Sequence, residues 1–70
     1  MNTGKMKATM ILNDDNQEKL AEALNLPISG VNARINGKID FRASEMVKII
    51  RRYHLTERET AEIFFDEVAS

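Results

Sequence analysis

The chain has 70 residues, 43% of them hydrophobic, with no cysteine, one histidine and a formal net charge of −1. This length accommodates one small domain, 1–70, and the absence of cysteine excludes disulfides and thiolate metal sites. No apolar run approaches the roughly 18 residues of a membrane span or the about 7 to 15 of a signal peptide, so we expect a cytoplasmic protein with no membrane partner.

The charges are distributed unevenly along the sequence. Residues 25–42 and 43–58 each carry a net +2, whereas residues 14–24 carry −3 and residues 59–70 hold four acids and no base. A basic middle and an acidic tail can make one surface cationic although the whole chain is acidic. The overall charge therefore does not exclude a nucleic-acid partner.

A first helix is expected over residues 5–12, where apolar side chains recur at helical spacing: Met6, Met10 and Ile11. The polar residues 13–16 interrupt this pattern. Asp15, with Glu18 three residues later, fits a capping box in which Asp replaces Ser or Thr, and predicts that the next helix starts at Asn16.

Residues 17–37, QEKLAEALNLPISGVNARING, predict two short helices joined by an elbow. The first half places three apolar side chains on one helical face: Leu20, Ala21 and Leu24. Asn25 tolerates the left-handed conformation that ends many helices, and Pro27 suits the first position of the next helix. That helix stops at Asn36-Gly37 and turns two apolar side chains inward: Val31 and Ile35. Because the elbow is short, the two helices should cross steeply.

The segment after this stretch is a loop followed by a fourth helix. In the loop, Ile39 and Phe41 are expected to fill the core. The helix begins at Ala43 or Ser44 and carries a broad apolar stripe: Met46, Val47, Ile49, Ile50 and Tyr53. Opposite it lie Lys48, Arg51 and Arg52. We expect the two arginines to face solvent or to pair with acids of the last helix.

Thr56 and Glu59 form a second capping box, which starts a last helix through Ala61, Ile63 and Phe64. Residues 66–70 are expected to fray. Five short helices without a strand signal predict a compact all-α domain with an ordered core of about residues 5–66.

The elbow segment resembles the helix-turn-helix of Xre-type regulators, the lambda-repressor-like and Cro-like phage DNA-binding domains. The resemblance is carried by residues of the two motif helices and by residues that follow them: Ala21, Asn25-Leu26, Val31, Ile35-Asn36-Gly37, Phe41, Glu45-Met46, Ile49, Leu55-Thr56 and Ile63-Phe64-Phe65. It covers roughly residues 5–66. Two positions depart from the family pattern, since Asn25 stands where Gly is usual and Pro27 where Ser or Thr normally caps the recognition helix.

The resemblance implies a five-helix lambda-repressor-like domain with a helix-turn-helix at helices two and three. It implies a sequence-specific, double-stranded DNA-binding transcriptional regulator, a small phage or prophage Cro-like repressor that reads the major groove of a palindromic operator with its third helix. No cofactor and no metal are expected, because a lone histidine cannot assemble a zinc site without carboxylates.

The outward face of the second motif helix supplies the candidate base-reading residues: Ile28, Ser29, Asn32 and Ala33. Residues that flank the groove are candidates for phosphate contacts: Asn16, Gln17, Asn36, Lys38 and Arg42. Arg34 is assigned to a phosphate or an intramolecular acid. Structural alternatives remain, with Ser29 as a helix cap, Asn36 as a helix stop, and Lys38 and Arg42 as solvated charges.

A helix can bury only one of two adjacent phenylalanines in a small core, so we expect a homodimer, weak or formed on DNA, through Phe64, Phe65 and Val68. A second functional class is a helical protein-interaction module, antirepressor or antitoxin-like, on the same scaffold. An enzyme is the third, and the residue inventory argues against it. No nucleophile or oriented carboxylate accompanies His54, which we interpret as a helix-end residue, so no catalytic residue is assigned.

Overall fold

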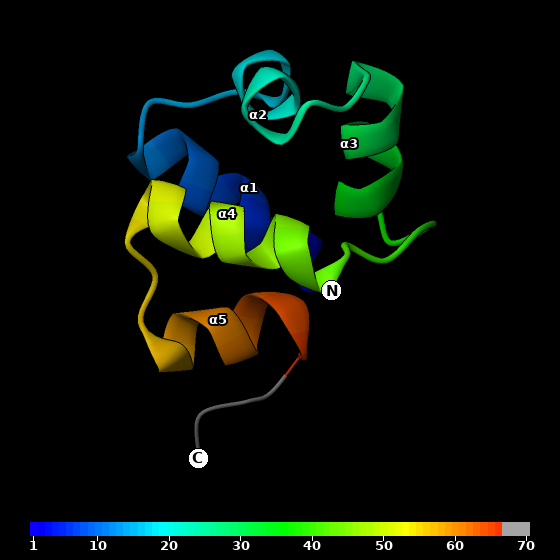
Figure 1. The fold of residues 1–70 in the computed structure, drawn as a ribbon. Helices are drawn as coiled ribbons and strands as arrows, with labels where there is room; N and C mark the ends of the chain where they lie inside the picture. Colours follow the sequence, from blue (N-terminus) through cyan, green and yellow to red (C-terminus); the bar gives the residue numbers. More distant parts are fainter. Residues whose placement is uncertain (67–70) are drawn as a thin grey trace.

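Five α-helices, and no strand, make up residues 1–66, the part of the chain that the computed structural model describes (Figure 1). They are α1 (Thr3–Leu12), α2 (Gln17–Leu24), α3 (Ile28–Ile35), α4 (Ala43–Tyr53) and α5 (Glu57–Phe64). The all-α class predicted from the sequence is confirmed. None of these helices has the length and apolar character needed to cross a membrane.

The first helix begins two residues earlier than expected. The side chain of Asn2 caps it by accepting a hydrogen bond from the backbone N–H of Lys5, at 3.0 Å. Met6 and Met10 are buried, as predicted, but Ile11 is 76% exposed. The expectation that Ile11 joins the stripe is wrong, because a residue next to Met10 lies about 100° further round the helix.

Asn16, and not Asp15, caps α2. The Asn16 side chain accepts from the backbone N–H of Lys19 at 2.8 Å. The carboxylate of Asp15 instead receives two hydrogen bonds from the Arg52 guanidinium, at 2.8 and 2.9 Å, and one from the Tyr53 hydroxyl. The capping box predicted at Asp15 is therefore wrong, and so is the pairing of Arg52 with the last helix.

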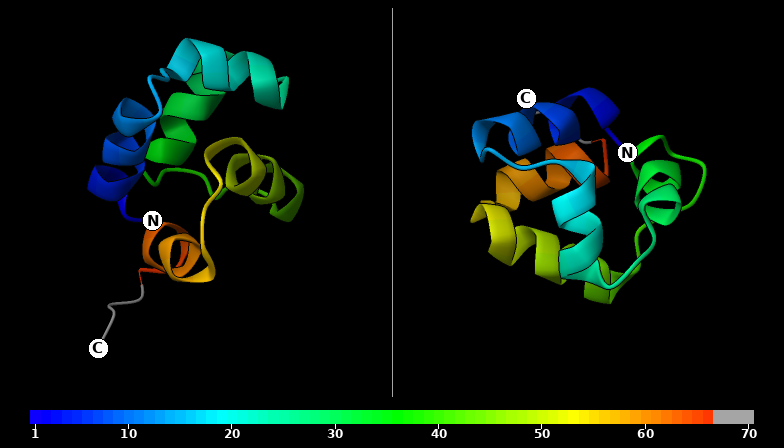
Figure 2. Two further views of the ribbon diagram at one scale, coloured as in Figure 1. Left: turned by 90° about the vertical axis from the view of Figure 1, so that its left-hand side faces the viewer. Right: turned by 90° about the horizontal axis from the view of Figure 1, so that it is seen from above.

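The elbow between α2 and α3 forms through backbone geometry. Asn25 adopts the left-handed conformation, with φ of 55°, and the N–H of Leu26 donates to the carbonyl of Ala21 at 2.9 Å. Pro27 is extended, with ψ of 153°, so it precedes the helix as its N-cap and α3 begins at Ile28. The prediction that Pro27 is the first helical residue is wrong. The two helices cross steeply (Figures 1 and 2), as expected.

The loop and α4 bury fewer side chains than expected. Phe41 is buried and meets Phe64 edge to face, with ring centroids 5.9 Å apart. Ile39 is 50% exposed, so its predicted place in the core is wrong. Of the predicted stripe only Ile49 and Tyr53 are buried; Met46 and Ile50 are partly buried and Val47 is exposed. His54 follows the helix as its C-cap, in the left-handed conformation, and its interpretation as a helix-end residue is confirmed.

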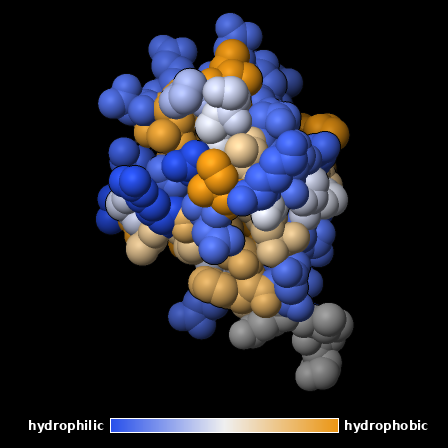
Figure 3. All heavy atoms as spheres, turned by 90° about the vertical axis from the view of Figure 1, so that its right-hand side faces the viewer, coloured by the Kyte–Doolittle hydropathy of each residue, from blue (hydrophilic) through white to orange (hydrophobic). Residues whose placement is uncertain are grey.

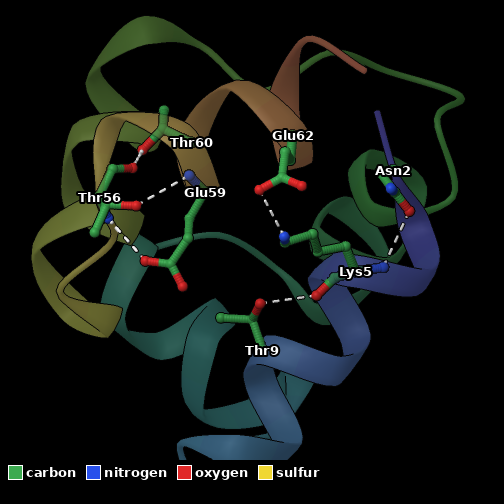
Figure 4. Close-up of polar contacts among 7 residues, drawn as sticks. All are labelled: Asn2, Lys5, Thr9, Thr56, Glu59, Thr60 and Glu62. Atoms are coloured by element: carbon green, nitrogen blue, oxygen red, sulfur yellow. Dashed lines mark hydrogen bonds and ion pairs between the residues drawn. The ribbon is translucent and has the colours of Figure 1, made fainter. Parts of the chain in front are cut away.

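The last helix starts at the predicted capping box (Figure 4). The Thr56 hydroxyl accepts from the Glu59 N–H at 3.1 Å, and the Glu59 carboxylate accepts from the Thr56 N–H at 2.9 Å. An ion pair of 2.9 Å between Lys5 and Glu62 joins α1 to α5. The backbone N–H of Asn2 also donates to the carbonyl of Ile63, at 2.7 Å. The first and last helices thus lie side by side.

One hydrophobic core joins all the described helices. Each helix supplies at least one side chain with no exposed surface: Met6, Leu20, Val31, Ile35, Ile49 and Ile63. Burying such a side chain stabilises the fold by about 1.5 to 3 kcal/mol. The core therefore fixes α2 and α3 against the other three helices and determines which face of α3 meets solvent.

Candidate nucleic-acid interface

The outer face of α3 contains the side chains that the sequence singles out for reading bases. Val31 and Ile35 are fully buried beneath it. Ile28, Ser29 and Asn32 are exposed, and Ala33 is half-buried. On this side of the molecule hydrophilic side chains surround several apolar ones, some of which gather in the lower part of the view (Figure 3). The surface can therefore offer hydrogen bonds together with a few apolar contacts.

Three carboxamide side chains form a hydrogen-bonded chain across this face, which we call the amide relay: Asn36, Asn32 and Gln17. The Nδ2 of Asn36 donates to the Oδ1 of Asn32 at 3.0 Å, and the Nδ2 of Asn32 donates to the Oε1 of Gln17 at 3.2 Å. The relay links α3 to the first residue of α2. It brings together a predicted base-reading residue and two predicted phosphate contacts.

Only one of the two contacts in the relay could be predicted from the sequence. Asn32 and Asn36 are four residues apart, a spacing that places side chains on one helical face. Gln17 lies on another helix, fifteen residues away from Asn32 in the chain. Its contact with Asn32 depends on how α2 and α3 pack, so no local pattern could have found it.

The Arg34 side chain forms hydrogen bonds within the molecule. Its Nε donates to the Glu45 carboxylate at 3.0 Å and its Nη1 donates to the carbonyl of Gly30 at 3.0 Å. The side chains of Arg34 and Glu45 are 11% and 9% exposed. A side chain at Gly30 would come within 3.3 Å of the guanidinium, so glycine leaves room for it. Of the two roles considered for Arg34, the intramolecular acid is confirmed.

Glu45 also anchors the start of α4. Its carboxylate accepts from the backbone N–H of Arg42 at 2.9 Å, beside the bond from Arg34. Burial opposes the charged carboxylate, but these hydrogen bonds outweigh burial and lower the pKa of Glu45. The role of Glu45 as a buried partner of Arg34 does not follow from the sequence, because a glutamate in the first turn of a helix ordinarily faces water.

The predicted phosphate contacts lie around the relay. Asn16 uses its side-chain oxygen to cap α2, which leaves its amide N–H groups for another partner. Asn36 is the C-cap of α3, so it is a helix end as well as a relay member. Lys38 and Arg42 are exposed in the segment between α3 and α4. Ser29 lies inside the first turn of α3, after the N-cap Pro27, and does not occupy the cap position.

A second surface lies at the junction of the loop, α4 and α5. A concavity of about 310 Å³ is lined by mainly apolar side chains: Met1, Arg34, Ile39, Asp40, Phe41, Met46, Phe64 and Phe65. Phe64 is partly buried and contacts Phe41, whereas Phe65 is 60% exposed. Of the two phenylalanines only Phe64 packs against the core, and it is partly rather than fully buried. Val68, the third predicted dimer residue, lies outside the described residues.

Another polar cluster joins the loop before α2 to the end of α4. The hydrogen bond from Arg52 is the main cause that lowers the pKa of Asp15 to about 2, against the effect of burial, and the Tyr53 hydroxyl lowers it further. Burial and the bond to Asp15 raise the pKa of Tyr53. The cluster is therefore a fixed ion pair with a neutral tyrosine donor.

Within residues 1–66, no group of three histidine, aspartate or glutamate side chains is placed to hold a metal ion. No protein-family model matches the chain, and neither a curated protein nor a solved structure matches it significantly.

Proposed function

We propose that the protein is a sequence-specific regulator of transcription that binds double-stranded DNA, as a small Cro-like repressor of the Xre type. In this proposal α2 and α3 are the helix-turn-helix and α3 enters the major groove. The observation that supports it best is the polar outer face of α3, centred on the amide relay and presented by a helix that crosses α2 steeply. An α-helix with its side chains is about 10 to 12 Å in diameter, which suits a groove about 12 Å wide.

Each exposed side chain of this face has a partner of matching chemistry on DNA. The Asn32 carboxamide pairs with the N6 and N7 edge of adenine, and Ser29 donates or accepts one hydrogen bond. Ile28 and Ala33 contact thymine methyl groups. Gln17 and Asn16, at the N-terminus of α2, bind a phosphate together with free backbone N–H groups. Lys38, Arg42 and Asn36 contact phosphates on the flank.

A homodimer completes the proposal. One α3 with few charged contacts gives modest affinity, and helix-turn-helix domains gain affinity by binding two half-sites about 34 Å apart. The exposed Phe65 beside an apolar concavity supports an association through this end of the molecule. The expected operator is then a palindrome.

Selection of bound duplexes from a random pool tests the proposal. We expect a palindromic consensus, and affinity that falls steeply between low and moderate salt because phosphate contacts release counterions. Asn32→Ala should reduce discrimination at one base pair by about 1 to 3 kcal/mol. Asn13→Ala, an exposed asparagine at the end of α1, is the matched control and should keep the wild-type preference. A pool that yields no enriched sequence would refute the proposal.

A protein-interaction module, antirepressor or antitoxin-like, is the second candidate, and the exposed Ile39 and Phe65 around the concavity support it. Binding of a protein partner through these apolar side chains should change little with salt. Salt dependence of binding thus separates the two candidates.

A further inference from the structure

The amide relay uses half of the hydrogen-bonding capacity of Asn32. A carboxamide has two N–H donors and an oxygen with two lone pairs. One N–H is bonded to Gln17 and one lone pair accepts from Asn36. One N–H and one lone pair remain, and because Asn32 is exposed they can meet a ligand.

The relay also restricts independent rotation of the Asn32 carboxamide. An isolated asparagine can turn its amide by 180° and exchange the places of nitrogen and oxygen. Turning Asn32 alone would put its oxygen against the oxygen of Gln17 and its nitrogen against the nitrogen of Asn36, and both hydrogen bonds would be lost. The orientation of Asn32 is therefore coupled to those of Gln17 and Asn36.

We propose that Gln17 and Asn36 are positioning residues that restrain the Asn32 carboxamide and so strengthen its preference for one base. This inference rests on the proposed function. Adenine presents its N7 acceptor and N6 donor in a fixed order, and an amide held in the matching order loses less conformational freedom on binding. Gln17 then contributes to specificity through its oxygen, in addition to any phosphate contact of its nitrogen.

Two substitutions at Gln17 separate these contributions. Gln17→Ala removes the acceptor for Asn32 and any phosphate contact together. Gln17→Glu keeps an oxygen that accepts from the Asn32 amide, but it loses the N–H donors and adds a negative charge near DNA. We expect Gln17→Glu to weaken binding to every duplex while keeping the preference at the base pair that Asn32 reads. Gln17→Ala should lose both affinity and most of that preference, a loss of about tenfold.

Asn36→Ala tests the other end of the relay, because it removes the donor to the Asn32 oxygen. It should reduce discrimination at the same base pair as Gln17→Ala, with Asn13→Ala again as the control. Adding Gln17→Ala to Asn32→Ala should reduce that discrimination no further, since the positioned amide is already gone. If Gln17→Ala weakens all duplexes equally and leaves the preference intact, Gln17 is only a phosphate contact and the inference is wrong.

A measurement without DNA keeps this inference distinct from the proposed function. Side-chain ¹⁵N relaxation of the Asn32 amide in the free protein should show greater mobility in Gln17→Ala and in Asn36→Ala than in the wild type and in Gln17→Glu. Unchanged mobility in both alanine variants would overturn the positioning role even if DNA binding is specific. Absence of a selected duplex, with mobility changed as expected, would refute the function and leave the relay established as a structural device only.

Discussion

Asp15 shows how a single side chain can take a role that its local sequence does not indicate. It precedes α2 and follows the pattern of a helix cap, but its side chain is only 4% exposed and it binds Arg52 and Tyr53 of α4. A carboxylate this buried needs charged or strong donors, and α4 supplies them. Asn16 caps α2 instead, because its uncharged amide oxygen accepts the backbone hydrogen bond equally well.

The lowered pKa of Asp15 makes the stability of the fold depend on pH. Since the pKa falls from 3.8 to about 2 on folding, the folded state favours the deprotonated carboxylate. The resulting stabilisation, about 1 to 2 kcal/mol after screening at the partly exposed Arg52, is complete above about pH 5 and is lost as the pH falls towards 2. Chemical denaturation at several pH values measures it.

Asp15→Asn should lower the free energy of unfolding at pH 7 and flatten its decline between pH 5 and pH 2. The lowered pKa of Glu45 acts in the same direction, so part of the decline should persist in this variant. Asp14→Asn, in the same loop but exposed, is the control and should change stability at pH 7 by less than about 0.5 kcal/mol. An Asp15→Asn curve that coincides with the wild type at every pH would contradict the assignment.

At the level of helices, the junction of α3 and α4 depends on the pair Arg34–Glu45. The two side chains are largely buried, and Glu45 also holds the first turn of α4. The ion pair holds the side of α3 that faces α4, and the opposite side of α3 is exposed to solvent. It also holds Arg34 against Glu45, which leaves the proposed contact face nearly uncharged.

Arg34→Ala should destabilise the fold by about 3 kcal/mol, because it leaves a buried carboxylate without its cation. Thermal or chemical unfolding measures the loss. Arg51→Ala, on the exposed side of α4, is the control, with an expected change within about 0.5 kcal/mol. The double variant with Glu45→Ala should cost less than the two single changes added together. Strict additivity would show that the two side chains do not interact energetically.

Helices α1 to α4 are predictable because each buries apolar side chains at helical spacing, as with Met6 and Met10 or Val31 and Ile35. The capping box at Thr56 and the left-handed Asn25 are equally local signals. The predictions for Pro27 and Ile39 are wrong because the first residue of a helix and the burial of a loop side chain depend on how neighbouring helices pack. For the candidate site, the exposed face of α3 follows from periodicity. The links from Asn32 to Gln17 and from Arg34 to Glu45 join separate elements, and no spacing rule gives them.

For the assembled domain, Phe65 is the residue whose exposure has the clearest consequence. A phenylalanine that is 60% exposed beside an apolar concavity favours association with a second copy. Phe65→Ser should leave the stability of the monomer nearly unchanged and raise the dissociation constant of the proposed homodimer about tenfold or more. Sedimentation equilibrium over a concentration series measures this change.

Ile11→Ser is the matched control, since Ile11 is 76% exposed but does not line the concavity. It should leave the dimer unaffected. A wild-type protein that stays monomeric at high concentration, and binds a palindromic duplex one to one, would contradict the homodimer.

The pairing of α1 with α5 has a consequence for biosynthesis. Met6 is buried in a core that Ile63 completes, and the bonds from Asn2 and Lys5 to α5 join the same two helices. At about 5 to 20 residues per second, a ribosome makes α5 several seconds after α1. During that interval the apolar side of α1 lacks the cover that α5 provides, so this domain cannot complete its core until α5 has been made.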